Sequence, residues 1–140
     1  MREFSTTVDI AAPPSRVWEV MRDVERWHEW TASITSIERL DEGPLKVGSG
    51  ARVRQPKLLS ARFEVTVLEE GRGFDWRTRS AGVTAVGQHW IQPIGAGCRV
   101  TLSVVYGGAL GWLVARVYAD LTRRYLAMEA EGLKRRSESE

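Results

Sequence analysis

The chain has 140 residues and a mass of 15.7 kDa, the size of one compact domain. Its 43% apolar and 27% charged residues exclude wholesale disorder, and its net charge of +2 is too small for a protein that binds nucleic acid through charge. The single Cys98 excludes an internal disulfide and a metal site built from several cysteines.

The first residues of the chain and its apolar stretches indicate where in the cell the protein is expected. Residues 1–10 are polar and alternating, unlike a secretory signal. The longest apolar stretch, residues 109–117, contains Arg116 and is too short to cross a bilayer. Together with the lone thiol of Cys98, these features predict a cytoplasmic protein without stable insertion into a membrane.

The N-terminal segment predicts one strand followed by two short helices. Apolar and polar residues alternate over residues 4–10, which is typical of a half-buried strand. Pro13 and Pro14 end this strand and are well placed at the first turn of a helix. Apolar residues then recur at helical spacing, at Val17, Val20, Met21 and Val24. Trp27 and Trp30 follow three residues apart, on a second helical turn or at its exit.

The middle of the chain predicts six further strands in an antiparallel meander. They are expected at residues 33–40, 51–55, 62–68, 74–79, 83–91 and 99–106. Turns that contain glycine or proline separate them at roughly 8–12-residue spacing, which is typical of such a meander. Phe63 and Val67 are expected to share the apolar face of one strand. On the next strand, Trp76 faces the opposite way from Arg77 and Arg79, which places both arginines outside.

The last segment predicts one long amphipathic helix, from near residues 109–113 to at least Leu133. Its apolar stripe, with a period of 3.6, is Leu110, Val114, Val117, Leu121, Tyr125 and Met128. This helix is the only predicted element long enough to cover an apolar sheet face, so we expect Val114, Val117, Leu121 and Tyr125 to contact the sheet. A twisted sheet curled around a helix leaves a wedge, which becomes a cavity if side chains do not fill it.

Three segments carry a resemblance to a known superfamily. IAAPPSRVW (residues 10–18) is similar to an I-x-A-P-x-x-x-V-W signature, and DVERWHEW (residues 23–30) to a D-x-x-x-aromatic-x-x-W element. GCRVT (residues 97–101) is similar to a G-T-x-[V/L]-T strand entry, with Cys98 where threonine is usual. These signatures and the order of elements resemble the START-like, or SRPBCC, superfamily, which includes the birch-pollen-allergen-like proteins and the polyketide cyclase/dehydrase group.

The resemblance covers residues 1–140 as one domain and implies an α+β helix-grip fold. In that fold a curved antiparallel sheet of six to seven strands wraps around a long C-terminal helix, with two short helices after the first strand. The resemblance also implies a hydrophobic cavity between sheet and helix, which the family uses for lipids, polyketides, hormones and other apolar ligands. Some members catalyse cyclisation or dehydration and others only bind or carry, so the fold alone assigns no activity.

The candidate ligand-contacting residues are the mostly apolar side chains expected around this cavity: Trp27, Trp30, Phe63, Val65, Phe74, Trp76, His89, Ile91, Val114 and Tyr118. Aromatic side chains supply large apolar area with few rotatable bonds, which suits planar or polycyclic ligands. Trp27 and Trp30 are expected at the mouth of the cavity, where the short helices meet the sheet edge. Trp112 lies off the helix stripe and is expected to be a partly exposed lid residue.

His89 is the one candidate acid or base. If Ile91 faces inward, the period of two brings His89 inward as well, whereas the opposite register would put Trp90 inside; the sequence leaves both open. An inward His89 is either a hydrogen-bonded core residue or a group for ligand contact or acid–base work. No pattern of a serine nucleophile, a dinucleotide loop or a metal site is present, so we expect neither cofactor nor metal.

The sequence favours a module that binds or transports an apolar small molecule of lipid, polyketide or aromatic type. One alternative is an enzyme of the polyketide cyclase/aromatase type with His89 as its acid or base. A second is a protein-interaction domain that uses the exposed sheet face. Two or more convergent polar groups inside the cavity would favour chemistry, and an entirely apolar wall would favour carriage.

Overall fold

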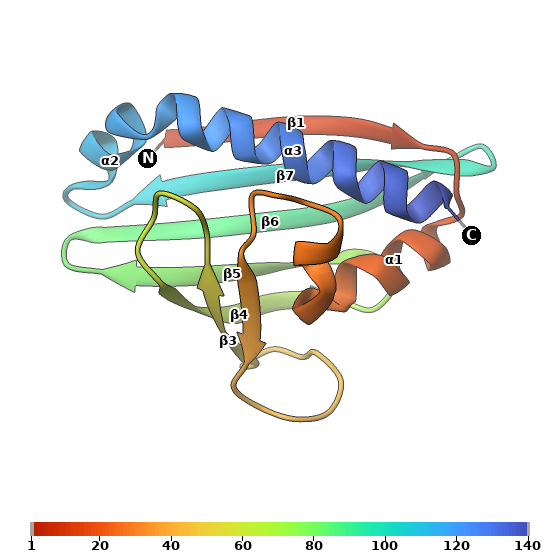
Figure 1. Ribbon diagram of the computed structural model, residues 1–140, viewed down its shortest axis with the longest axis horizontal. Helices are drawn as coiled ribbons and strands as arrows, with labels where there is room; N and C mark the ends of the chain where they lie inside the picture. The colour runs from red at the N-terminus through yellow and green to blue at the C-terminus, as the bar shows by residue number, and fades with distance from the viewer. Residues whose placement is uncertain (1, 140) are drawn as a thin grey trace.

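The computed structural model describes residues 2–139 and contains one seven-stranded antiparallel sheet with helices packed on it (Figure 1). The strands are β1 (Arg2–Ile10), β2 (Ser36–Arg39), β3 (Gly50–Arg54), β4 (Ala61–Glu69), β5 (Gly73–Ser80), β6 (Val83–Ile94) and β7 (Gly97–Gly107). The helices are α1 (Pro14–Arg22), the 3-10 helix η1 (Val24–Glu29), α2 (Gly111–Val117) and α3 (Ala119–Glu138). The strand order is β1-β7-β6-β5-β4-β3-β2, a meander to which β1 returns beside β7.

The predicted meander and the two short helices after the first strand are confirmed. Pro13 and Pro14 lie at the start of α1, whose buried residues are Val17, Trp18, Val20 and Met21. The 3-10 helix η1 then buries Val24 and Trp27. Figure 1 shows α3 lying across β1 and β7, with α1 at the opposite end of the sheet from α2. This is the helix-grip arrangement that the resemblance implies.

Strand β4 departs from the predicted alternation because it contains a bulge. Val65 pairs with Trp76 and Val67 pairs with Asp75, so the register shifts by one residue at Thr66. The shift turns Val67 outward, where it is 43% exposed, and Leu68 packs against the core instead. The prediction that Val67 shares the inner face with Phe63 is therefore wrong.

The prediction of one continuous C-terminal helix is also wrong, because α2 and α3 meet at a bend at Tyr118 (φ −101°, ψ 15°). The backbone N–H groups of Tyr118 and Thr122 still donate to carbonyl oxygens four residues earlier, at 2.9 and 2.8 Å. The start of α2 is held to the β5–β6 turn by a 2.8 Å hydrogen bond from the Leu110 N–H to the Gly82 carbonyl. Helix α3 instead packs along β1, so the two helices follow different strands and their axes diverge.

The face that α3 buries differs from the predicted stripe. Its buried residues are Thr122, Leu126, Ala130, Gly132, Leu133 and Ser137. Of the predicted contact residues, Val117 is 66% exposed, and Leu121 and Tyr125 are half-buried. The buried face is displaced because small residues such as Gly132 let the helix approach neighbouring segments closely, whereas periodicity weights only the large apolar residues.

The core lies between the sheet and these helices. Its most buried large side chains include Trp27, Phe74, Met21 and Leu102. Among residues 2–139, no helix is long and apolar enough to cross a membrane.

Candidate functional site

The interior beneath α3 contains a cluster of six rings from η1, β4, β5 and β6 and the residue after η1. We call Trp27, Trp30, Phe63, Phe74, Trp76 and His89 the aromatic cluster. Trp27 is at its centre, with ring centroids 5.6 Å from Trp30, 5.4 Å from Trp76 and 5.1 Å from His89. Its indole N–H donates to the carbonyl oxygen of Met21 at 2.9 Å, so its polar atom is satisfied. Tilted and edge-on contacts of this kind favour a rigid, closely packed interior.

The register of β6, which the sequence leaves open, places His89 and Ile91 inward. Both side chains are buried, and the ring of His89 stacks on Phe74 with centroids 4.6 Å apart and planes at 21°. Trp90 faces outward, where its indole N–H donates to Asp75 Oδ1 at 2.7 Å. The same outer face carries Arg77, as predicted.

His89 joins the sheet to α3 through its two ring nitrogens. Nδ1 lies 3.3 Å from the carbonyl oxygen of Phe74, and Nε2 lies 3.3 Å from Oε1 of Glu129. A carbonyl oxygen only accepts, so a hydrogen bond at Phe74 requires the proton on Nδ1. Nε2 then lies on the side of the ring nearest the Glu129 carboxyl group. His89 and Glu129 are therefore the convergent polar groups of the interior.

Glu129 has a buried oxygen without a hydrogen bond. Oε1 is at ion-pair distance from His89, but the two groups are not aligned for a hydrogen bond, and Oε1 has no other hydrogen-bond partner within residues 2–139. Buried carboxyl oxygens are rarely left in this state, because the loss of water around them costs free energy. Oε1 can still accept a hydrogen bond from a bound molecule.

No pattern in the sequence identifies Glu129 as a partner of His89. The two residues are 40 positions apart, and no local motif links them. The helical spacing does contain a signal, because Glu129 precedes Leu133 by four residues and follows Leu126 by three, and both leucines are buried. This spacing would have predicted that Glu129 lies beside the buried face of the helix.

Half-buried apolar side chains lie on β4 and on α3, and we call them the rim. Phe63 is half-buried and lies 5.1 Å from Trp76, centroid to centroid. On the helix side, Leu121, Tyr125 and Met128 are half-buried, and the Tyr125 hydroxyl donates to the carbonyl oxygen of Pro56. That bond ties α3 to the β3–β4 loop (residues 55–60). The rim thus includes one ring of the aromatic cluster, Phe63, and apolar side chains of α3.

A second polar pair lies under the N-terminal half of α3. The hydroxyls of Tyr106 on β7 and Thr122 are 2.8 Å apart. Burial raises the pKa of Tyr106 above its usual value of 10.0, although the Thr122 hydrogen bond opposes this shift. The phenol therefore remains neutral to a higher pH than a free tyrosine.

The structure brings most of the predicted site residues together. Trp27, Trp30, Phe63, Phe74, Trp76 and His89 form the aromatic cluster, and Val65 and Ile91 are buried in the same core. Val114 and Tyr118 belong to α2 and its end, where Val114 is half-buried and Tyr118 is exposed. The expectation that Trp27 and Trp30 form the mouth is wrong, since they are only 2% and 5% exposed.

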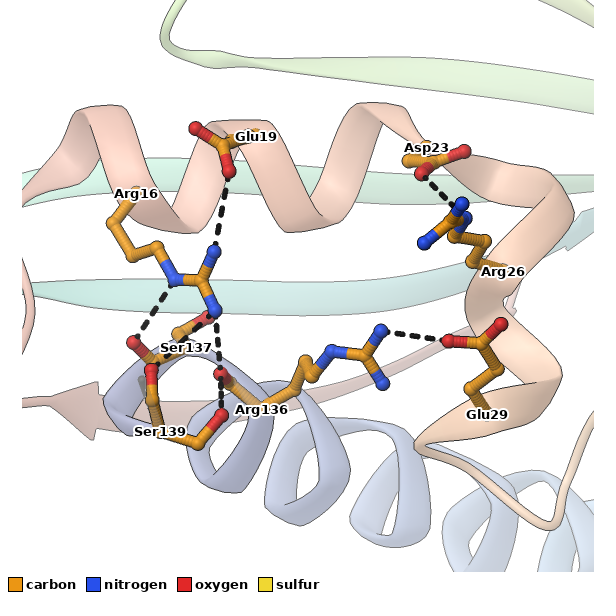
Figure 2. A network of polar contacts seen from close by, with 8 residues as sticks. All are labelled: Arg16, Glu19, Asp23, Arg26, Glu29, Arg136, Ser137 and Ser139. Carbon is orange, nitrogen blue, oxygen red and sulfur yellow. Dashed lines mark hydrogen bonds and ion pairs between the residues drawn. The ribbon is translucent and has the colours of Figure 1, made fainter.

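One hollow of about 140 Å³ lies between α1 and the end of α3, and Figure 2 shows the polar network around it. The Arg16 guanidinium donates to the carbonyl oxygens of Arg136 (3.1 Å), Ser137 (3.4 Å) and Ser139 (3.4 Å). Arg136 in turn pairs with Glu29 at 2.7 Å. These arginines are occupied by protein groups, so the network fastens the end of α3 to α1 and η1.

Another hollow, of about 450 Å³, lies on the outer face of the sheet beside Thr84, Val86, Gln88 and Val105. Neither of these two hollows lies between the sheet and α3, where the rings of the aromatic cluster are packed together. Within the described residues, no group of three or more His, Cys, Asp or Glu side chains is arranged to hold a metal ion.

Known proteins are similar to this chain in sequence and in structure. An uncharacterized protein of Mycobacterium tuberculosis is 28% identical over 102 residues, which cover 70% of this chain and 61% of that protein. The chain thus spans about three fifths of the length of the curated relatives that it matches.

Solved structures of the same fold include Ara h 8.0201, which is 15% identical with a TM-score of 0.72, and 99% of each chain is covered. A norcoclaurine synthase point mutant of Thalictrum, in complex with a transition-state analogue, is 14% identical with a TM-score of 0.75. That comparison covers 97% of this chain and 93% of the synthase. Identities this low show a common fold and nothing finer.

The model of one family matches almost the whole chain. It is described as "Polyketide cyclase / dehydrase and lipid transport", and it aligns with residues 1–138. The match includes every strand and helix described above, and it agrees with the helix-grip arrangement. The chain therefore belongs to the polyketide cyclase/dehydrase and lipid transport family, within the START-like (SRPBCC) superfamily.

Proposed function

We propose that this protein binds an apolar, ring-containing small molecule between β4–β6 and α3, against the aromatic cluster. The proposal rests mainly on the change from fully buried rings to half-buried apolar side chains in this region. The buried rings of Trp27, Phe74 and Trp76 continue into the half-buried ring of Phe63, and α3 carries the half-buried Tyr125. Such a surface can take up an apolar molecule when the rim opens, because it removes apolar area from water.

The same region can bind a polar group on that molecule. Glu129 Oε1 is buried without a hydrogen bond, close to His89 and the rings. A ligand hydroxyl or N–H that reaches this oxygen would satisfy it and orient the ring system. The ligand class that fits best is therefore an aromatic molecule with at least one hydrogen-bond donor, which is compatible with the lipid-transport and polyketide terms of the family description.

The proposal is tested by titration with a polarity-sensitive aromatic dye, followed by tryptophan fluorescence. Trp76→Ala should weaken binding about tenfold, because contact area against the ligand is lost. Trp90→Ala is the matched control, since Trp90 is on the outer face and should leave the affinity unchanged. Equal effects of the two substitutions, or no dye binding at all, would contradict the proposed site. Native mass spectrometry of organic extracts would identify a co-purified ligand.

A second candidate function is acid–base catalysis at the His89–Glu129 pair. The 3.3 Å separation of Nε2 and Oε1 favours it, because general acid–base work needs titratable groups that converge in the interior. The norcoclaurine synthase structure is of an enzyme with this fold. His89→Gln and Glu129→Gln would then retain dye binding but abolish turnover of a polyketide-like substrate. Turnover that survives both substitutions would exclude this candidate.

A further inference from the structure

Helix α2 buries its smallest residues and exposes its largest apolar ones. Gly111 and Ala115 are its buried residues, whereas Trp112 is 52% and Val117 66% exposed. An amphipathic helix on a globular protein normally does the reverse. Large exposed apolar side chains gathered on one element mark a surface that meets another apolar phase.

Neighbouring segments extend this apolar surface. We call Leu59, Leu110, Trp112, Leu113, Val117 and Tyr118 the α2 patch, and each of these side chains is exposed. Leu59, at 92%, is in the β3–β4 loop, which the Tyr125–Pro56 hydrogen bond holds against α3 two helical turns beyond Tyr118. Leu110 lies on Gly82 of the β5–β6 turn. Figure 1 shows that α2, this loop and this turn lie at the same end of the molecule.

Basic side chains are exposed on the elements that carry the α2 patch or adjoin it. Lys57, Arg79, Arg116 and Arg124 are exposed in the loop, at the end of β5, on α2 and on α3. Asp120 is the one acidic residue in the sequence from position 76 to 128, and it pairs with Arg123 at 3.7 Å. Exposed leucine, valine, tryptophan and tyrosine accompanied by lysine and arginine are typical of a surface that lies in the headgroup region of anionic lipids.

We propose that the α2 patch docks this protein on anionic lipid surfaces. Trp112, Val117 and Leu59 enter the boundary between headgroups and acyl chains, while Arg116 and its basic neighbours contact lipid phosphates. Docking of this kind is peripheral and reversible, in keeping with the absence of a membrane-spanning helix from residues 2–139. The inference concerns the outside of α2 and does not depend on what binds at the aromatic cluster.

The experiment is co-sedimentation with vesicles of phosphatidylcholine alone and of phosphatidylcholine with phosphatidylglycerol in equal parts. The protein should bind the anionic vesicles, and high salt should weaken the binding. Both the Trp112→Ser/Val117→Ser double variant and Arg116→Glu should reduce the partition coefficient about tenfold. Val67→Ser and Arg72→Glu are matched controls on the outer sheet face and the β4–β5 turn, and they should bind as the wild type does.

A second measurement separates docking from a folding defect. Vesicles should shift the tryptophan emission of the wild type to shorter wavelength, and Trp112→Phe should bind but lose most of the shift. The reason is that Trp18, Trp27, Trp30 and Trp76 are already buried. Unfolding midpoints of all variants should match that of the wild type. Anionic vesicles that are not bound, or are bound equally by the patch variants, would overturn the proposal. A Trp112-dependent dimer without vesicle binding would also overturn it and assign the patch to a second copy of the chain.

Discussion

Gly132 is a residue at which α3 approaches the backbone of another segment closely. A Cβ atom at this position would lie 1.9 Å from the carbonyl oxygen of Trp30, which is far inside van der Waals contact. The same carbonyl oxygen accepts a hydrogen bond from Arg135 Nη2 at 3.2 Å. The absence of a side chain at Gly132 thus allows α3 to pack directly on the backbone after η1.

Gly132→Ala should therefore destabilise the protein by about 1–3 kcal/mol, because the helix or Trp30 must shift to admit the methyl group. Helix propensity alone predicts the opposite sign, a gain of about 1 kcal/mol. Urea denaturation followed by circular dichroism measures the difference. Ala127→Gly on the exposed side of α3 is the control for propensity and should cost about 1 kcal/mol. A Gly132→Ala variant as stable as the wild type would refute the close contact.

The bend at Tyr118 divides the C-terminal amphipathic segment into two helices that pack on different parts of the sheet. Helix α3 packs along β1 and β7 through Leu126 and Leu133, whereas α2 crosses the ends of β6 and β7 on Gly111 and Ala115. Large side chains of α2 are consequently left on the outside. The change of direction separates the structural helix from the exposed apolar surface.

Leu126→Ala should cost about 2–5 kcal/mol of unfolding free energy, because Leu126 is 5% exposed in the core. Leu121 belongs to the predicted stripe but is half-buried, so Leu121→Ala should cost clearly less. Arg124→Ala on the exposed side should be nearly silent. Denaturation midpoints of the three variants test this order. A larger loss of stability for Leu121→Ala than for Leu126→Ala would show that the face predicted from the sequence, and not the one in the structure, is buried.

At the scale of the whole molecule, ion pairs join segments that are distant in the sequence. Asp9 on β1 pairs with Arg99 on β7 at 2.7 Å, and Glu29 pairs with Arg136 at 2.7 Å. Glu138 accepts hydrogen bonds from Lys134 at 2.6 Å and from the Ala11 N–H at 2.8 Å. These contacts fasten the N-terminal strand, η1 and the C-terminal helix to one another.

The ion pairs make the folded state sensitive to acid. The hydrogen bond from Arg99 lowers the pKa of Asp9, that from Arg136 lowers the pKa of Glu29, and that from Lys134 lowers the pKa of Glu138. A carboxyl group whose pKa is lowered in the folded state stabilises the fold. This stabilisation is fully present when the pH is above the ordinary pKa, which is 3.8 for aspartate and 4.5 for glutamate. That stabilisation is lost as the pH falls through the lower folded value.

Unfolding midpoints should accordingly be constant just above pH 4.5 and fall below it. Glu29→Gln should flatten part of this acid dependence, because the substituted side chain does not titrate. Because all three carboxylates are exposed, each contributes modestly. Midpoints that rise toward low pH, or an acid dependence unaffected by Glu29→Gln, would contradict this assignment.

Much of the candidate site could be predicted from local pattern. Strand alternation placed Phe74 and Trp76 on the inner face and Arg77 outside, and the structure confirms this division. Pattern could not reveal the bulge at Thr66 that turns Val67 outward, because a bulge depends on how two strands pair. It also could not bring Glu129 to His89, since their contact depends on the rotation of α3 about its axis.

The order of elements, the antiparallel meander and the helix-grip family could be inferred from the sequence, because these follow from periodicity, turn residues and short motifs. The inward register of His89, the bend at Tyr118, the buried face of α3 and the exposure of Trp112 and Val117 became known only from the folded structure. The physical reason is that periodicity records which residues are apolar, whereas burial depends on how closely two elements can approach. That approach is set by small residues such as Gly132 and Ala115, which hydrophobic patterns scarcely register.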